Sequence, residues 1–244
     1  MDFILQDIMG YGPDISLIDT EVDGVKPWCW SKHAQLNFDI IEKDWNDSHK
    51  EKFLKYTEGR RTVCVQAGGF MGMYPRLLSE HFERVYTFEP DPFNFFCLSF
   101  NCQKNNIIKM QTALGKEHKL ISVNRLFADN PGMNNINEEH HLIPMITIDS
   151  LNLDIVDFMQ IDVELYELNV IHGAIETIKK FKPVLSFELG SKQVIDKMNV
   201  PGFHHNGHTK YDTHEQDILD ILSPLGYKKI DMSCTDGIFI CEGD

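Results

Sequence analysis

A run of glycines and one glutamate stand where a nucleoside could bind. Gly68, Gly69 and Gly72 follow the short apolar run 63–67, which predicts a buried parallel strand that ends in a tight turn. Glu89 ends a second apolar run about 20 residues beyond that turn, where a carboxylate at a strand's carboxyl end can accept hydrogen bonds from both hydroxyls of a ribose. If the two strands are adjacent and parallel, an adenosyl group fits the cleft at their ends. A tight turn without a ligand is the alternative for the glycines alone.

A second group of acidic residues follows another apolar run, 156–161, which predicts a further buried strand. Asp162 would emerge at the carboxyl end of that strand and face the same crevice as Glu89. Glu164 and Glu167 come next, on the turn and the first helical positions. Negative charge stabilises a helix N-terminus by about 0.3 to 1 kcal/mol, so a purely structural role is the alternative for both glutamates. Asp162 is harder to explain in this way, because a carboxylate at the ligand edge of a hydrophobic strand needs a partner.

The elements that would position these residues alternate between strands and helices, which predicts an α/β fold. Apolar runs predict five core strands, at 63–67, 85–89, 107–113, 156–161 and 183–189. Apolar residues at helical spacing predict helices at 73–82, 95–102, 166–179 and 214–222. Strand-like runs near the end of the chain predict a hairpin, 227–231 with 237–241. Ahead of the core, a helix is predicted to begin at Asp47, and strand-like alternation marks 119–123 and 142–148.

The composition bounds the class of protein. A chain of 244 residues with 42% hydrophobic content suffices for one large α/β domain. The net charge of −14, from 23 basic and 37 acidic residues, disfavours duplex nucleic acid as a partner. The N-terminus lacks the features of a secretory signal and no apolar run reaches transmembrane length, so we expect a soluble, cytoplasmic protein. The six cysteines show no paired zinc spacing, which favours reduced, mostly buried thiols.

Together these motifs resemble a known family. The segment Ala67-Gly68-Gly69-Phe70-Met71-Gly72, the pair Glu89-Pro90 and the block Asp162-Val163-Glu164-Leu165-Tyr166-Glu167 are similar to those of class I methyltransferases that use S-adenosylmethionine. More narrowly, the block resembles the FkbM family, whose members carry Asp-Val-Glu-Gly-x-Glu after the fourth core strand. The resemblance covers about 63–241 and implies a Rossmann-like seven-stranded sheet, mostly parallel, with an antiparallel C-terminal hairpin strand. It leaves residues 1–57 as an N-terminal extension that packs on a methyltransferase domain, 58–244.

The resemblance implies S-adenosyl-L-methionine as the cofactor. The residues that would contact it are Gln66, Gly68, Gly69, Gly72, Glu89 and Ala113. Gln66 stands where many relatives have an acidic residue, whose charge would attract the ammonium of the methionine moiety. A glutamine offers only a neutral acceptor there, so one electrostatic contact is weaker.

The resemblance also implies O-methylation of a sugar, a glycan or another small hydroxylated metabolite. Methyl transfer to a hydroxyl requires the oxygen in line with the sulfonium methyl and a destination for the hydroxyl proton. Asp162 and Glu164 could take that proton, or with Glu188 they could hold a divalent cation such as Mg²⁺ that lowers the pKa of the hydroxyl. Leu165 replaces the family's glycine, and because leucine does not easily adopt positive φ, we expect a turn closer to ordinary helical geometry.

Three further segments are candidates for the acceptor side. The polar stretch 127–135 is either a loop over the active site or a merely solvated loop. Trp28 and Trp30 either form a wall of the acceptor pocket or pack inside the protein. The segment 202–208 is either an exposed polar loop or a source of a general base or metal ligands. Its histidines are His204, His205 and His208.

Two other functions fit the same motifs. A nicotinamide-dependent Rossmann oxidoreductase would need a crevice that admits a second nucleotide, and preferential binding of NAD would identify it. A non-catalytic nucleoside-binding protein on the same fold is the second alternative, because Gln66 and Leu165 depart from the family pattern. Cofactor binding without turnover across a broad panel of glycans and small alcohols would favour that protein.

Overall fold

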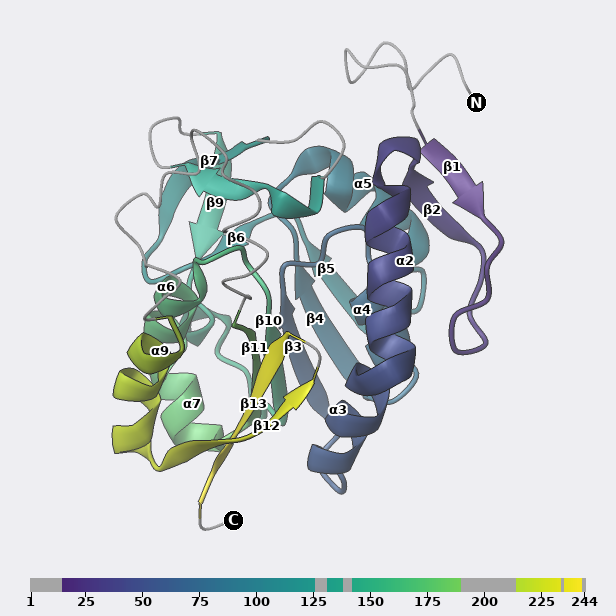
Figure 1. Ribbon diagram of the computed structural model, residues 1–244. Helices are drawn as coiled ribbons and strands as arrows, with labels where there is room; N and C mark the ends of the chain where they lie inside the picture. Colours follow the sequence, from purple (N-terminus) through teal and green to yellow (C-terminus); the bar gives the residue numbers. More distant parts are fainter. Residues whose placement is uncertain (1–14, 126–130, 138–141, 190–213, 234, 243–244) are drawn as a thin grey trace.

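The centre of the molecule is a seven-stranded sheet with helices on both faces (Figure 1). The computed structural model describes residues 15–125, 131–137, 142–189, 214–233 and 235–242. The histidine-rich segment 202–208 therefore lies outside the described residues. In spatial order, the strands of the central sheet are β12 (Tyr227–Ser233), β13 (Asp236–Cys241), β11 (Val184–Glu188), β10 (Phe158–Ile161), β3 (Val63–Ala67), β4 (Arg84–Phe88) and β5 (Ile107–Met110).

Five of these strands run parallel, in the order typical of Rossmann-like folds. β3 lies between β4 and β10, so the first two core strands are neighbours. β13 pairs antiparallel with β11, and β12 pairs antiparallel with β13. The prediction of a mostly parallel sheet that ends in an antiparallel C-terminal hairpin is confirmed.

Alternate residues of the central strands point to opposite faces, and helices bury both faces. Val63 and Val65 belong to one apolar cluster, whereas Cys64 between them belongs to the other. The helices over the first cluster are α6 (Glu167–His172), α7 (Ile175–Phe181) and α9 (His214–Leu222). The helices over the second are α2 (Gln35–Asp44), α3 (Lys50–Tyr56), α4 (Met73–Leu78) and α5 (Pro92–Asn101). Burial on both faces explains why the core strands have apolar rather than alternating sequences.

The described part of the N-terminal extension packs against the second face. It starts with an antiparallel ribbon of β1 (Ile15–Ile18) and β2 (Trp28–Ser31), followed by a short turn, Lys32–Ala34. The helix expected to begin at Asp47 is part of a longer helical run, in which a π-helical segment, Trp45–His49, joins α2 to α3. Trp28 and Trp30 are fully buried, so they pack inside the protein, which is one of the two roles predicted for them.

A second sheet of four strands follows β5 along the chain. Its strands, in spatial order, are β6 (Ala113–Leu114), β9 (Ile143–Ile146), β7 (Lys119–Asn124) and β8 (Asn135–Asn137). The predicted core strand over 107–113 is therefore too long, because Ala113 pairs with Met145 in the second sheet. The side chain of Thr112 donates to the Pro144 carbonyl at 2.6 Å and helps to draw the chain across. The predicted strands 119–123 and 142–148 pair with each other, as β7 and β9.

The helix predicted over 166–179 is two helices, because the chain breaks at Gly173 between α6 and α7. A Cβ atom at this position would lie 1.9 Å from the carbonyl oxygen of Gly115, so only glycine fits there. The Gly173 carbonyl accepts a hydrogen bond from the Asp149 N–H at 2.9 Å. The other short helical turns are Pro131–Met133, Asp149–Leu151 and Ser223–Leu225.

The described cysteines are reduced and buried, as predicted. They are Cys29, Cys64, Cys97, Cys102 and Cys241. No helix in the part of the chain that the structure describes has both the length and the apolar character needed to cross a bilayer.

Candidate functional site

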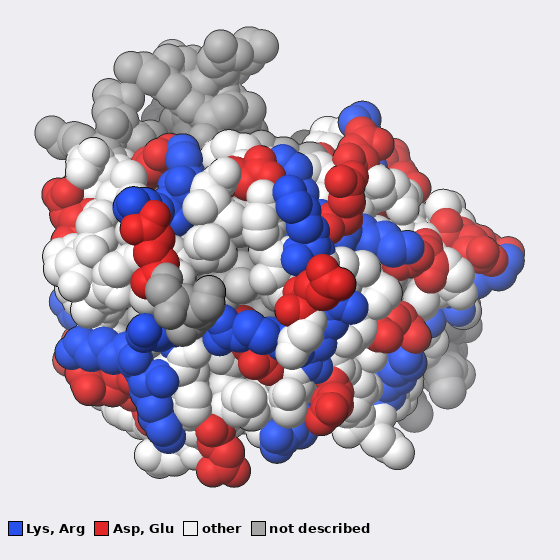
Figure 2. All heavy atoms as spheres, turned by 90° about the horizontal axis from the view of Figure 1, so that it is seen from below, with Lys and Arg blue, Asp and Glu red and all other residues white. Residues whose placement is uncertain are grey.

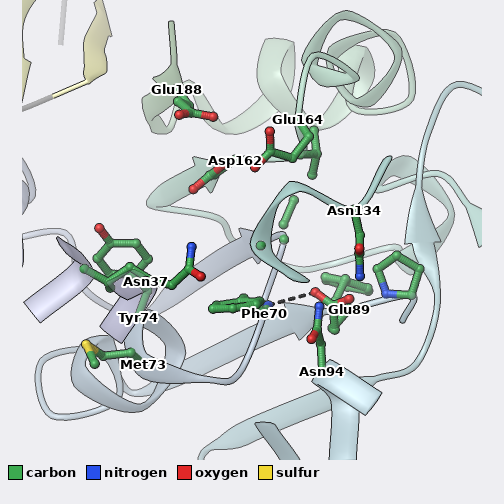
Figure 3. A pocket seen from close by; sticks show the side chains of 18 of the residues that line it. Asn37, Phe70, Met73, Tyr74, Glu89, Asn94, Asn134, Asp162, Glu164 and Glu188 are labelled. Carbon is green, nitrogen blue, oxygen red and sulfur yellow. Dashed lines mark hydrogen bonds between the residues drawn. The ribbon is translucent and has the colours of Figure 1, made fainter. Parts of the chain in front are cut away.

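A pocket opens where the parallel strands end (Figure 3). Its wall includes the residues that directly follow β3, β4 and β10 and the last residue of β11, the usual position of ligands in open α/β sheets. The sequence-predicted residues that line it are Gly68, Gly69, Glu89, Ala113, Asp162, Glu164 and Glu188. The other two, Gln66 and Gly72, do not line it.

The glycine turn passes between two neighbouring strands. The N–H groups of Gly68 and Gly69 donate to the Phe88 carbonyl at 3.1 and 2.8 Å, which ties the turn to the end of β4. Gly68 has a φ of +83°, and a Cβ atom on it would lie 1.7 Å from the carbonyl oxygen of Asp162. Glycine at position 68 is therefore required for the turn to pass this close to the end of β10.

Glu89 lies next to the glycine turn, as ribose binding in this cleft requires. Its Oε2 accepts a hydrogen bond from the Phe70 N–H at 2.8 Å (Figure 3). Its Oε1 accepts one from the Asp91 N–H at 2.8 Å. The side chain is 6% exposed, and burial raises its pKa to about 8 although both backbone hydrogen bonds favour the charged form. Each carboxylate oxygen has a further lone pair, so Glu89 can still accept hydrogen bonds from ligand hydroxyls.

Gln66 and Gly72 shape the turn without lining the pocket. The Oε1 of Gln66 accepts from the Thr87 hydroxyl at 2.6 Å, and its Nε2 donates to the Gly68 carbonyl at 2.8 Å. The predicted contact between Gln66 and the cofactor is therefore corrected to a supporting role, since the side chain is fully buried behind the turn. A Cβ atom on Gly72 would lie 3.0 Å from the Cα of Leu98, so this glycine permits close packing of α4 on α5.

From Glu89 the pocket extends toward the second sheet. The wall there is largely apolar and includes Pro90, Thr112, Ala113, Leu114, Val123 and Ile136. The polar stretch predicted either to cover the site or to be solvated contributes Pro131, Gly132 and Asn134 to the wall. This end of the pocket has the apolar character that suits an adenine ring.

Asp91 connects the start of α5 to Arg125 and Asn134. Its Oδ1 caps the helix by accepting from the N–H groups of Phe93 and Asn94 at 2.8 and 3.1 Å. The guanidinium of Arg125 donates to both oxygens of Asp91, at 2.7 and 3.1 Å, and Asn134 donates to Oδ2 at 3.3 Å. Asp91 itself is buried and does not line the pocket.

The opposite end of the pocket is acidic. Asp162, Glu164 and Glu188 each offer a carboxylate oxygen, and these oxygens lie within 4.8 Å of one another. Asp236 lines the same region. Burial raises the pKa of Asp162 to about 7, with repulsion from Asp236 adding to it, and also raises the pKa of Asp236 to about 7. Burial and repulsion from Asp162 raise the pKa of Glu164 and Glu188 well above the usual range. Such a group of carboxyls either retains protons or attracts a positive charge.

The turn that carries Glu164 differs from the predicted one. Glu164 and Leu165 have φ angles of +54° and +69°, in the left-handed region that glycine favours. The expectation that Leu165 would impose ordinary helical geometry is wrong, because the leucine adopts the left-handed turn. The Val163 N–H donates to Oε1 of Glu167 at 3.0 Å, which closes the chain into this tight bend.

Glu167 has the structural role considered for it above. It is buried and does not line the pocket, whereas Glu164 does. Besides accepting from the Val163 N–H, its carboxylate lies 3.1 Å from Nε2 of His214, the buried first residue of α9. These contacts tie the acidic turn to α9.

Sequence reasoning missed several polar residues of the pocket wall, among them His49, Tyr74 and Asp236. Nε2 of His49 lies 2.9 Å from the Ser233 carbonyl, so this nitrogen carries a proton, and Nδ1 accepts from the Tyr74 hydroxyl at 2.9 Å. Burial lowers the pKa of His49, which favours the neutral imidazole. No local motif marks these residues, because they come from the N-terminal extension, α4 and the C-terminal hairpin.

The remaining side of the pocket is formed by α2. Four residues of this helix line the pocket: Asn37, Ile40, Ile41 and Asp44. They follow helical spacing and therefore form one stripe along the helix. Among the residues that the structure describes, neither Lys nor Arg contributes to the pocket wall. The electrostatic character of the site is therefore set by carboxyls.

Solved structures of other methyltransferases show distant similarity to this chain. Methyltransferase FkbM from Methylobacillus flagellatus KT is 19% identical with a TM-score of 0.49, over 74% of this chain and 43% of that one. N-methyltransferase NodS from Bradyrhizobium japonicum WM9, in complex with S-adenosyl-L-homocysteine, is 11% identical with a TM-score of 0.43, over 79% and 83% of the two chains. A type 11 methyltransferase from Sulfolobus solfataricus, described as putative, is 12% identical with a TM-score of 0.43, over 81% and 94%. This chain thus spans less than half the length of the FkbM structure.

A family model gives the assignment. No protein of curated function matches the chain. Residues 82–229, more than half of the 244 residues, match the model described as the methyltransferase FkbM domain. The matched segment contains Glu89, the acidic block with Asp162 and Glu164, and Glu188. The chain therefore belongs to the methyltransferase FkbM domain family.

Proposed function

We propose that this chain is an S-adenosylmethionine-dependent O-methyltransferase that acts on a sugar, a glycan or another small hydroxylated metabolite. The observation that carries the proposal is the position of Glu89 beside the Gly68 turn, in a pocket whose other end presents Asp162 and Glu164. A nucleoside-binding end and an acidic end in one pocket are what methyl transfer from an adenosyl cofactor to a hydroxyl requires. Membership of the FkbM family supports the same reaction class.

The residues of the pocket fit this cofactor. Glu89 can accept hydrogen bonds from the ribose hydroxyls, and Gly68 and Gly69 allow close approach to the turn. The apolar wall around Ala113 suits adenine. The bound cofactor supplies an electrophilic methyl group on a positively charged sulfur, and a wall of carboxyls is electrostatically complementary to that charge.

Asp162 and Glu164 are proposed to position or deprotonate the acceptor hydroxyl, with Asp162 as the group that accepts its proton. Burial brings the pKa of Asp162 to about 7, close to the value that serves a general base at neutral pH. Glu164 reaches the pocket because of the left-handed turn at positions 164 and 165. The two carboxyls therefore act from the same side of the acceptor.

A divalent cation is the second route for the same proton. Asp162, Glu164 and Glu188 present hard oxygen ligands within 4.8 Å of one another, the kind that Mg²⁺ prefers. A cation held there would lower the pKa of the acceptor hydroxyl. The two routes differ in their response to a chelator.

The experiment measures S-adenosylhomocysteine formation with a panel of sugars, glycans and small alcohols, with Mg²⁺ or with EDTA. Asp162→Asn should lower turnover by about 100-fold or more without weakening cofactor binding, since a positioned proton acceptor contributes about that much. Asp154→Asn, at an exposed position outside the pocket, is the matched control and should change neither. Activity that survives EDTA assigns the proton to the carboxyls, whereas activity restored only by Mg²⁺ assigns it to the cation route.

Two results would count against the proposal. If Asp162→Asn turned over at the wild-type rate, Asp162 would not be the proton acceptor. Preferential binding of NAD over S-adenosylmethionine would identify a nicotinamide oxidoreductase instead.

A further inference from the structure

We propose that the α2 stripe, formed by Asn37, Ile40, Ile41 and Asp44, is the acceptor-binding wall of the pocket. In this proposal it admits a hydroxylated acceptor with an apolar face and no negative charge. The inference rests on the proposed methyl transfer and adds to it the class of acceptor and the residues that select it.

The position of the stripe within the pocket is the first argument. Glu89 and the apolar wall around Ala113 are assigned to the nucleoside, so an acceptor has to enter from the other side. Figure 3 shows Asn37, Met73 and Tyr74 on the side away from Asn94 and Asn134, with Phe70 between the two groups. The acceptor side is therefore formed by α2 and the start of α4, close to the acidic turn after β10.

The packing of α2 makes this wall rigid. Phe38, which does not line the pocket, is buried on another face of the helix against Trp28 and Trp30, with ring centroids 6.3 and 5.2 Å away. Trp30 in turn makes an edge contact with Phe70 at 5.3 Å. The aromatic core thus fixes α2 and the Phe70 ring relative to each other, so a specificity surface built on them would be preorganised.

The apolar character of the wall is the second argument. Ile40 and Ile41 from α2 line the same pocket as Phe70 and Tyr74. Ile40 remains 48% exposed, so part of an isoleucine at the pocket faces water until a ligand covers it. Asn37 adds an amide that can bind a hydroxyl. This combination suits a sugar or alcohol that carries an apolar ring or chain.

Charge is the third argument, and it excludes anions. The carboxyls on the pocket wall are Asp44, Glu89, Asp162, Glu164, Glu188 and Asp236. The described part of the wall has neither Lys nor Arg to compensate them. The described wall therefore offers an anionic acceptor no compensating positive charge. Each ionised carboxyl about 8 Å from a carboxylate or phosphate on the acceptor would weaken its binding by roughly tenfold or more, at an effective dielectric constant of about 20.

The test uses two probes of nearly the same shape that differ in charge, 4-nitrophenyl β-D-glucopyranoside and 4-nitrophenyl β-D-glucuronide. Each is titrated calorimetrically into the 244-residue chain saturated with S-adenosylhomocysteine. The neutral glucoside should bind about tenfold more tightly than the glucuronide. A glucuronide that binds as well or better, or the failure of both probes to bind, overturns the proposed acceptor class.

Two lysine variants on α2 test the wall itself. Ile40→Lys places a positive charge on the stripe and should reduce the preference for the glucoside at least about threefold. Leu36→Lys is the matched control: Leu36 is 71% exposed on the same helix but does not line the pocket, so its variant should keep the wild-type preference. Equal behaviour of the two variants overturns the role of the stripe.

Cofactor binding separates this inference from the proposed function. Both variants should bind S-adenosylhomocysteine as tightly as the wild type, because α2 lies away from the nucleoside end. If the wild type does not bind S-adenosylhomocysteine, the proposed function fails. If the wild type binds S-adenosylhomocysteine but binds the two probes equally well, or if the two lysine variants behave alike, only the inference about α2 fails.

Discussion

Leu165 has a backbone conformation that its side chain disfavours. Its φ of +69° follows the +54° of Glu164, so two non-glycine residues in succession adopt the left-handed region. Each such residue costs about 1 to 2 kcal/mol relative to right-handed geometry. Strain of this kind is kept where the surrounding structure requires it, and here the bend brings Glu164 to the pocket wall.

Substitution at position 165 should measure that strain. Leu165→Gly relieves it, whereas Leu165→Ala removes nearly the same side chain but keeps the Cβ atom that causes it. We expect the glycine variant to have a free energy of unfolding about 1 kcal/mol higher than the alanine variant, measured by urea unfolding. Equal stability of the two variants would show that the left-handed turn is not strained.

The buried carboxyls should make the free protein less stable as pH rises. The pKa of Glu89 is raised from 4.5 to about 8, and those of Asp162 and Asp236 from 3.8 to about 7. Above the unfolded-state values and below the folded-state values, the folded chain holds protons that the unfolded chain has released, so raising the pH favours unfolding. His49, with a lowered pKa, acts in the opposite sense only below about pH 6.5.

The window from about pH 6.5 to 8 therefore isolates the carboxyls. Urea unfolding should give a lower free energy of unfolding at pH 8 than at pH 6.5, and the slope should be smaller in Glu89→Gln, which cannot ionise. Each group contributes at most about 1.4 kcal/mol per pH unit. A free energy of unfolding that rises across this window would contradict the assigned pKa directions.

At the scale of single residues, the sequence predicted the site residues that lie at strand ends. It missed those that come from segments distant in the sequence. Gly68, Glu89 and Asp162 were found because each follows an apolar run, so their place at one edge is a consequence of parallel pairing. Gln66 was misjudged because its side chain lies within the sheet, hydrogen-bonded to Thr87. The side chain of a residue inside a strand is directed by the pleat rather than toward the strand's end.

At the scale of elements, one buried carboxylate joins the start of α5 to the segments beside β7 and β8. Asp91 caps α5 and accepts two hydrogen bonds from Arg125 and one from Asn134, so the segment that carries Asn134 is fixed next to Glu89. The nucleoside end of the pocket thus depends on an ion pair between segments 34 positions apart.

Arg125→Gln should weaken the anchoring of the segment that carries Asn134 with little effect on the stability of the protein. The Arg125 side chain is 46% exposed, and pairs of this kind contribute at most about 1 kcal/mol, so the free energy of unfolding should change little. Affinity for S-adenosylhomocysteine should fall by about threefold to tenfold, because the wall beside Glu89 loses its anchor. Lys119→Gln, another partly exposed basic residue, is the control. Unchanged affinity in Arg125→Gln would show that this contact does not shape the pocket.

The core strands were predictable because both faces of the sheet are buried, which leaves continuous apolar runs in the sequence. The errors in the predicted elements occur where tertiary contacts determine the ends of a strand or helix. Ala113 leaves the core strand to pair with Met145, and Gly173 ends α6 because the Gly115 backbone passes too close for a side chain. Neither contact has a local signal in the sequence.

At the scale of the whole molecule, the pocket lies where the family-matched segment meets the part of the chain before it. The family model begins at residue 82, yet the glycine turn, the α2 stripe and His49 lie earlier. Residues on both sides of that boundary share the aromatic and apolar cluster on the second face of the sheet. The site therefore needs both segments.

The outer surface has a different charge pattern from the pocket. On the face seen in Figure 2, Lys and Arg side chains are interspersed with Asp and Glu. The pocket wall, by contrast, has carboxyls without basic partners among the described residues. The expectation that duplex nucleic acid is not a partner stays a prediction, based on the net charge of −14.

The most direct test of the central claim is calorimetric titration of S-adenosylhomocysteine into the wild type, Glu89→Gln and Glu83→Gln. Glu83 is exposed, six positions before Glu89 and outside the pocket, so its variant is the matched control. We predict binding by the wild type and by Glu83→Gln, and an affinity about 10- to 100-fold weaker in Glu89→Gln, because the amide replaces one acceptor oxygen with a donor and leaves a ligand hydroxyl unpaired. Circular dichroism should show all three folded. No binding by the wild type, or full affinity in a folded Glu89→Gln, would contradict the account.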